Sequence, residues 1–187
     1  QGGRAARGKP VIQCIAIRPD ERIAALVPVK QFIDSKWLLF ATRNGTVKKT
    51  VLSAYGNVRA NGINAINIED GDELIDVQII DGNNDIVLAT RLGMSIRFHE
   101  SDAREMGRAT TGVKGIELDQ DDAVIGMVVI QRDSTLLVVA ENGAQLFDPK
   151  TETIRLLAPP PPVALVEWLT RRNVPLSVGH SIVATVE

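Results

Sequence analysis

Stretches rich in lysine and arginine alternate with acidic stretches along this chain, a pattern suited to binding phosphate groups. From Lys36 to Arg59 there are five cations and no acid, whereas residues 60–90 hold seven acids and no cation. A second basic run, 91–114, is followed by a second acidic run, 117–122. Rows of cations neutralise backbone phosphates and release counterions, so they give affinity without sequence specificity. The net charge of -2 does not by itself indicate a polyanion partner, so the prediction depends on where the fold places these charges.

The candidate phosphate-binding residues are cations of these two basic runs: Arg43, Lys48, Lys49, Arg59, Arg91, Arg97, Arg104, Arg108 and Lys114. In a closed array of similar units, equivalent loops lie on the same border, so the charge pattern predicts one basic rim and one acidic rim. The alternative is that these charges lie on the solvated faces of edge strands, where lysine residues in natural sheets prevent aggregation. Aromatic residues make up 4% of the chain, which favours duplex DNA over stacked single strands.

Residues that could carry out covalent or metal chemistry are isolated in the sequence. Cys14 lies inside an apolar run and is predicted to be a small buried hydrophobe. Tyr55 lies in a turn after a strand and is predicted to be structural, and the acid pairs at 72–73 and 121–122 are predicted to cap turns. We therefore expect no catalytic residue, no metal, no cofactor and no small-molecule substrate.

A repeat of roughly fifty residues organises the chain and must position these cations. Residues 41–49 are echoed by 89–97 and more weakly by 140–143, and Gly45, Gly93 and Gly143 are spaced by 48 and 50 residues. We name the Arg- and Gly-containing segments 4–12, 59–66 and 108–116 the first, second and third openings, and the segments 20–27, 71–78 and 121–128 the acid-led runs. Each unit is predicted to hold four short strands: an opening, an acid-led run, a Leu-Leu-x-Ala-Thr type run and the run after the glycine turn. Such repeats are typical of propeller-like arrays.

Composition is that of an ordinary soluble globular protein, with 187 residues, 44% hydrophobic and 24% charged. No apolar run approaches the length that spans a bilayer, and the first residues lack the apolar region of a secretory signal. We expect a cytoplasmic protein without membrane partners.

A succession of motifs resembles the C-terminal domain of the A subunit of DNA gyrase over residues 1–143. The motifs are Arg7-Gly8-Lys9-Pro10, Gly45-Thr46-Val47-Lys48-Lys49-Thr50, Asp70-Gly71-Asp72-Glu73-Leu74-Ile75, Ile96-Arg97-Phe98, Arg104-Glu105-Met106-Gly107-Arg108 and Gly112-Val113-Lys114-Gly115-Ile116. The resemblance implies a six-bladed β-pinwheel whose basic perimeter bends and wraps duplex DNA. It assigns phosphate contacts first to Lys48, Lys49, Arg59, Arg97 and Arg108.

The same resemblance implies partners and a place in catalysis. The remaining gyrase subunits and the missing blades would be partners, and wrapping of one hand would support negative supercoiling by an ATP-dependent topoisomerase. The DNA-cleaving tyrosine and the ATPase lie outside this kind of domain, so this chain would hold no catalytic site.

Three departures from the family pattern are visible. About three units are present where six are expected, so the usual disc is not expected to close. The glutamine-led, Arg- and Gly-rich box that family members need for wrapping is not recognisable, and residues 144–148 contain no cation.

The tail after Asp148 has a different character. Residues 158–162 form a Pro-rich spacer, 163–172 a predicted helix and 176–181 a predicted strand. This stretch resembles a fragment of N-acetylglucosamine-6-phosphate deacetylase, in which His180 would match a metal ligand. A metal site needs several convergent ligands, so His180 is predicted to face solvent in a turn. The abrupt switch suggests a chimaeric, frameshifted or misassembled reading frame.

The sequence thus predicts an all-β fold, a partial β-pinwheel of about three four-stranded blades with a short α/β C-terminal tail. Residues 1–148 form the DNA-binding part and 149–187 the atypical tail. The predicted function is an accessory duplex-DNA-binding and wrapping module of a bacterial type II topoisomerase. Alternatives are a propeller-like protein-interaction module without DNA binding and, remotely, a relic of a metal-dependent amidohydrolase centred on His180.

Overall fold

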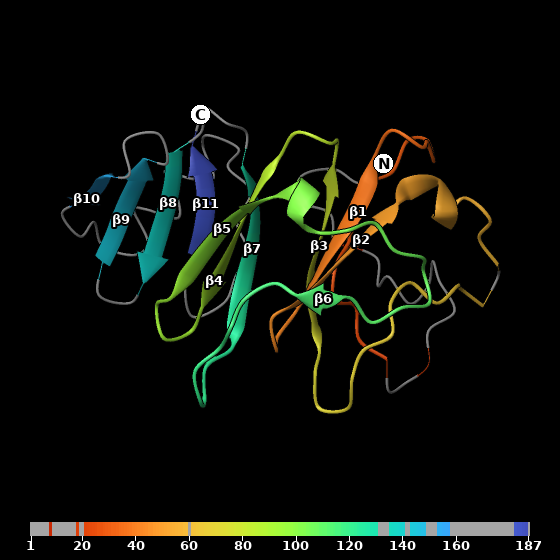
Figure 1. Ribbon diagram of the computed structural model, residues 1–187, viewed down its shortest axis with the longest axis horizontal. Helices are drawn as coiled ribbons and strands as arrows, with labels where there is room; N and C mark the ends of the chain where they lie inside the picture. The colour runs from red at the N-terminus through yellow and green to blue at the C-terminus, as the bar shows by residue number, and fades with distance from the viewer. Residues whose placement is uncertain are drawn as a thin grey trace.

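The computed structural model describes residues 8, 18, 21–59 and 61–130 in full, and four later strands by their backbone. The described chain is all-β and forms three antiparallel sheets, which Figure 1 shows side by side. The strands are β1 (Trp37–Thr42), β2 (Thr46–Val51), β3 (Leu74–Ile80), β4 (Asp85–Thr90), β5 (Ser95–His99), β6 (Val113–Lys114), β7 (Val124–Ile130), β8 (Thr135–Ala140), β9 (Gly143–Asp148), β10 (Thr153–Leu157) and β11 (Ile182–Val186). Two short 3-10 helices, η2 (Leu52–Tyr55) and η3 (Glu100–Asp102), follow β2 and β5.

Each of the first two sheets is completed by a strand from the following repeat unit. β1 and β2 form a hairpin, and β3, which begins within the second acid-led run, pairs with the other edge of β1. β4 and β5 form the equivalent hairpin, and β7, from the third acid-led run, pairs with β4. Both pairings shift register at the same repeat position, between Ala41 and Thr42 and between Ala89 and Thr90. The repeat predicted from sequence is therefore confirmed, with its strands exchanged between neighbouring units.

The openings contribute less strand than predicted. The third opening forms the two-residue strand β6 on the free edge of β2, giving the order β3-β1-β2-β6, whereas residues 61–66 of the second opening form no strand. The second sheet, β5-β4-β7, therefore has three strands rather than four. A Cβ on Gly112 would lie 2.5 Å from the Val47 carbonyl oxygen, and one on Gly115 would lie 2.7 Å from the Val47 side chain. These two glycines are therefore needed for the opening to approach β2 so closely.

The acid pairs cap hairpin turns, as the sequence predicts. The Asp72 carboxylate accepts hydrogen bonds from the backbone N–H of Asn44 and of Glu73, at 2.8 Å each. In the next unit the Asp122 carboxylate accepts from the N–H of Leu92 at 3.0 Å and of Ala123 at 2.8 Å. Burial raises the pKa of Asp122, but these bonds, with one from Thr90, outweigh it and lower that pKa overall.

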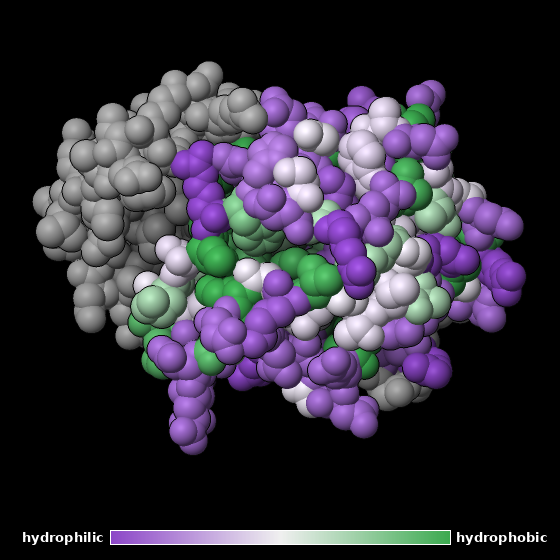
Figure 2. Space-filling view, viewed as in Figure 1, coloured by the Kyte–Doolittle hydropathy of each residue, from purple (hydrophilic) through white to green (hydrophobic). Residues whose placement is uncertain are grey.

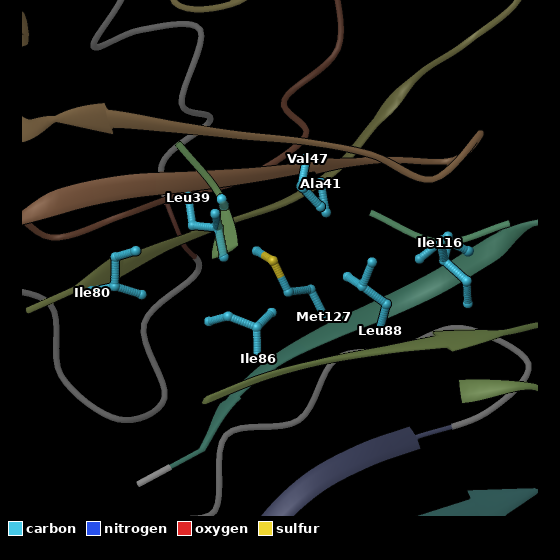
Figure 3. Close-up of a cluster of buried hydrophobic side chains, with 10 residues drawn as sticks. Leu39, Ala41, Val47, Ile80, Ile86, Leu88, Ile116 and Met127 are labelled. Atoms are coloured by element: carbon cyan, nitrogen blue, oxygen red, sulfur yellow. The ribbon is translucent and has the colours of Figure 1, made fainter. Parts of the chain in front are cut away.

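The principal core lies between the first two sheets (Figure 3). Leu39 and Ala41 of β1 face Ile86 and Leu88 of β4, and Met127 of β7 lies between them. The alternate β1 residues Leu38 and Phe40 pack on the other face, in a second cluster with Leu52, Tyr55 and Val77. Because β1 is buried on both faces, its sequence is a continuous apolar run instead of an alternating one.

The third sheet, β10-β9-β8-β11, repeats the order of the first sheet, with β11 in the position of β3 and β10 in the position of β6. β10 and β11 come from the predicted tail and pair with β9 and β8. Strands from both sides of the predicted boundary at Asp148 therefore share one sheet, and the division into 1–148 and 149–187 stays a prediction. The predicted spacer, helix and strand, with His180 and Cys14, lie outside the described residues.

Candidate nucleic-acid interface

Lys48 is a buried cation in the middle of β2. Its side chain is fully buried, and its ammonium donates to the backbone carbonyls of Ala65, at 2.6 Å, and of Arg108. The ammonium also lies 5.5 Å from the centre of the Phe40 ring. Desolvation, helped by the nearby Arg108 guanidinium, lowers the pKa of Lys48 from 10.5 to about 8. Lys48 is thus a donor inside the protein, and its ammonium is not accessible to a phosphate.

The two carbonyls that Lys48 binds belong to different openings, which lie together over the outer edge of β2. Asn67 joins them further: its N–H donates to the Thr110 carbonyl and its side-chain amide to the Ala109 carbonyl, both at 3.0 Å. The Tyr55 hydroxyl also donates to the Ala65 carbonyl, at 3.1 Å. In Figure 1 the green stretch after η3 passes beside the gold stretch after η2. The second and third openings therefore form one hydrogen-bonded shelf along the molecule.

Tyr55 has the structural role that the sequence predicts. It is buried and packs against Phe40, with ring centres 6.1 Å apart. Burial raises the pKa of its hydroxyl above the usual range, which outweighs the lowering by a Thr50 hydrogen bond and the Arg108 charge. A phenol with a raised pKa that is engaged with a carbonyl is poorly suited to nucleophilic attack.

Lys49 points to the other side of β2 and stabilises the junction between the sheets. Its ammonium lies 3.0 Å from a carboxylate oxygen of the fully buried Glu100 and 4.8 Å from the centre of the Trp37 ring. The other Glu100 oxygen accepts from the N–H groups of Gly82 and Asn84, at 2.8 Å each. The sequence did not identify Glu100, because nothing in a single chain marks an acid before a turn as the partner of a lysine fifty-one positions earlier.

The second unit uses these two positions differently. Ile96 takes the place of Lys48 and is 38% exposed on β5, and Arg97 takes the place of Lys49. The Arg97 guanidinium is paired with the Asp85 carboxylate on the neighbouring strand β4. Figure 2 shows an apolar area near the middle of this face, between β5 and β6, with polar residues around it.

The predicted separation into a basic rim and an acidic rim is wrong at the hairpin turns. Arg43 lies 3.1 Å from the Glu73 carboxylate, and Lys114 lies 2.8 Å from the Glu117 carboxylate. Arg91 is close enough to Asp122 to lower the pKa of that carboxyl, after its hydrogen bonds. For Arg43 and Arg91 the reason is strand exchange, which brings the acidic turn of each unit beside the basic turn of the unit before it, whereas Lys114 is paired with an acid three residues along the chain.

Three predicted cations remain exposed or half-exposed without an acidic partner among the described residues: Arg59, Arg104 and Arg108. Arg59 and Arg108 belong to the second and third openings, and Arg104 precedes the third opening by four residues. The Arg108 side chain makes one long contact, 3.5 Å, with the Asn64 carbonyl. The shelf, taken to include Arg104, thus carries three exposed or half-exposed cations that no described acid pairs.

Within residues 21–59 and 61–130, no group of His, Cys, Asp and Glu side chains is arranged to hold a metal ion. No helix in the described part of the chain is long and apolar enough to cross a membrane.

The fold and this shelf define a class: a β-propeller-like repeat domain with exchanged strands and cationic loops along one border. The family model of the DNA gyrase C-terminal domain, described as a beta-propeller, matches residues 1–30, 36–81 and 84–131. The chain belongs to this family.

Curated relatives and solved structures agree with the assignment. The DNA gyrase A subunit of Chlamydia muridarum (strain MoPn / Nigg) is 44% identical over 146 residues, which are 76% of this chain and 18% of that protein. The DNA gyrase A subunit of Escherichia coli (strain K12) is 42% identical over 140 residues, 75% of this chain and 16% of that protein. The chain therefore spans less than a fifth of the length of these relatives.

Two solved structures have the same fold. The C-terminal domain of DNA topoisomerase IV has a TM-score of 0.69 at 32% identity, covering 76% of this chain and 45% of that one. A DNA gyrase A C-terminal domain has a TM-score of 0.68 at 21% identity, covering 78% of this chain and 48% of that one. At that lower identity the likeness concerns the fold alone.

Proposed function

We propose that this chain binds and wraps duplex DNA as an accessory module of a cytoplasmic type II topoisomerase of the gyrase A kind. The observation that carries the proposal is the shelf of two openings, where Arg59, Arg104 and Arg108 have no acidic partner among the described residues. Family membership supports a nucleic-acid role for these charges and favours it over the protein-interaction module. The remaining gyrase subunits and further blades would be the protein partners.

The proposal narrows the set of phosphate contacts. Arg59, Arg104 and Arg108 are the first choices, because a phosphate meets no competing carboxylate there. The other predicted cations at the surface already have an acidic neighbour, which they would leave or share in order to bind a phosphate: Arg43, Arg91, Arg97 and Lys114. Exposed ion pairs of this kind are weak enough to open. Lys48 and Lys49 are assigned to the protein interior, so their removal would act on DNA binding only through the fold.

Wrapping requires the duplex to follow the border from one opening to the next. Bending a duplex over a site of this kind costs on the order of a few kcal/mol, which the added phosphate contacts must offset. Contacts of this kind are independent of sequence, so any duplex would be bound. The handedness of the wrap would then determine the sign of the DNA crossing that reaches a separate cleavage core.

The test is a duplex of random sequence with a fluorophore at each end, titrated with the full chain. Binding with a rise in energy transfer between the ends is expected, since wrapping brings the ends together. Binding without that rise would refute wrapping and leave a DNA-contacting domain. A chain that leaves the duplex unbound at low salt would refute the DNA role itself and revive the protein-interaction module.

A further inference from the structure

We propose that Lys48 is a positioning residue that locks the second and third openings together and so sets the spacing of the arginines that face DNA. The inference rests on the proposed DNA-binding role of the shelf, but the contact itself does not involve DNA. Its basis is one ammonium that donates to a carbonyl in each opening, Ala65 and Arg108.

Lys48 lies outside both openings and bonds to each of them, whereas the Arg108 side chain reaches the second opening only through one long contact with the Asn64 carbonyl. β2 supplies the base on which they lie: the third opening pairs with it at Val47, and the Met106 N–H donates to the Lys49 carbonyl at 2.8 Å. Between these two points residues 107–112 leave the sheet and meet residues 64–67. Lys48 reaches from the buried centre of β2 to that meeting point, where Arg108 begins the third opening.

A fully buried ammonium is expensive to maintain unless its donors are used. Here the donors are taken by two backbone carbonyls and the Phe40 ring face, and no carboxylate takes part. A carbonyl-bound lysine keeps its positive charge uncompensated by an acid, so the shelf gains order without gaining a negative charge. An Asp or Glu in the same place would weaken phosphate binding beside Arg108.

The second unit shows what the residue adds. Its counterpart Ile96 is 38% exposed, and no described strand pairs with the free edge of β5. Of the first two sheets, the one with openings on its edge carries the lysine, and the one without a described strand there carries an apolar residue.

The first experiment is amide hydrogen exchange without DNA on the full chain, comparing the unmodified protein with Lys48→Met. The readout is the exchange rate of the Asn67 amide, which donates to the Thr110 carbonyl, divided by the rate of amides in β1. We expect this ratio to rise by about tenfold or more in Lys48→Met. Lys49→Met is the matched control: it removes the neighbouring buried lysine, and the ratio should stay within about twofold of the unmodified value. An unchanged ratio in Lys48→Met would overturn the inference.

The second experiment asks whether Lys48 acts through the arginines. Lys48→Met should weaken duplex binding by about tenfold when it is the single substitution. In a protein that already carries Arg59→Gln and Arg108→Gln, it should weaken binding by less than about threefold, because the arginines that Lys48 positions are then absent. Equal losses in both backgrounds would overturn the inference.

Two outcomes separate this inference from the function on which it rests. If the unmodified chain does not bind DNA, the proposed function fails, and the exchange ratio still decides whether Lys48 joins the openings. If Lys48→Met does not fold, Lys48→Gln, which keeps a shorter donor, replaces it in both experiments with the same expected directions.

Discussion

Raising the pH should stabilise this protein through Lys48, an unusual direction that follows from its burial. The folded-state pKa is lowered from 10.5 to about 8, first by desolvation and then by the Arg108 charge. Between these two values the unfolded chain holds a proton at Lys48 that the folded chain has lost. Stability rises with pH wherever the unfolded state binds more protons, so the gain begins near the folded pKa and ends near the unfolded one.

The size of the effect follows from the shift. One pKa unit corresponds to about 1.4 kcal/mol, so the full shift is worth on the order of 3 kcal/mol, and about 2 kcal/mol of it should be gained by about pH 9.5. Tyr55 acts in the opposite direction, because its pKa is raised above 10.0 and its stabilisation is lost at higher pH. The clean window for Lys48 therefore ends below pH 10.

The assay is urea unfolding of the unmodified chain and of Lys48→Met at about pH 7.5 and about pH 9.5, with the free energy of unfolding extrapolated to water. The difference between the two proteins cancels the titration of every other group. We expect that difference to move in favour of the unmodified chain by about 2 kcal/mol at the higher pH. A difference that stays constant across the window would show that Lys48 is not buried as a cation and would refute the reasoning.

Three further predictions concern stability. Glu100→Gln leaves the Lys49 ammonium buried without its counter-charge and should lower the free energy of unfolding by about 3 to 5 kcal/mol in urea titrations. Adding Lys49→Met should recover part of this loss. If the effects of the two substitutions simply add, the pairing is contradicted. Gly115→Ala places a Cβ 2.7 Å from a valine methyl and should lower the thermal midpoint through a cost of about 1 to 3 kcal/mol, whereas Gly107→Ala, which meets nothing within 4 Å, should change it little; similar effects at both sites would argue against the close approach. Asp122→Ala should lower the free energy of unfolding by about 1 kcal/mol at neutral pH. Because the pKa of Asp122 is lowered in the folded protein, the difference between the two proteins should shrink below about pH 4, where acid protonates the carboxyl of the unmodified protein. A difference that stays the same in acid would exclude the charged cap.

The repeat and the turn chemistry could be predicted because they depend on neighbouring residues. A glycine after Ala-Thr-Arg-x specifies a hairpin within one unit, and an acid pair before an apolar run specifies a local turn cap; both are found, although each acid also bonds to the hairpin turn of the unit before it. These features are local in sequence or shared by the fold as a whole.

The fate of individual cations could not be predicted, because it depends on contacts between units. Lys48 and Lys49 are adjacent in sequence and both cationic, yet alternation along β2 directs one to the openings and the other to Glu100. The charge period suggested segregated rims, but strand exchange sets Arg43 beside Glu73. β2 pairs on both edges because β6 comes from the third opening, and nothing in the sequence of β2 indicates this.

The salt dependence of duplex binding tests the central claim most directly. The slope of log affinity against log salt should be steep for the unmodified chain and should fall by about 0.9 for each of Arg59→Gln, Arg104→Gln and Arg108→Gln, while Lys36→Gln, outside the shelf, should leave it nearly unchanged. A slope near zero, or one that the three shelf substitutions leave as steep as before, would contradict the assignment of this border to DNA.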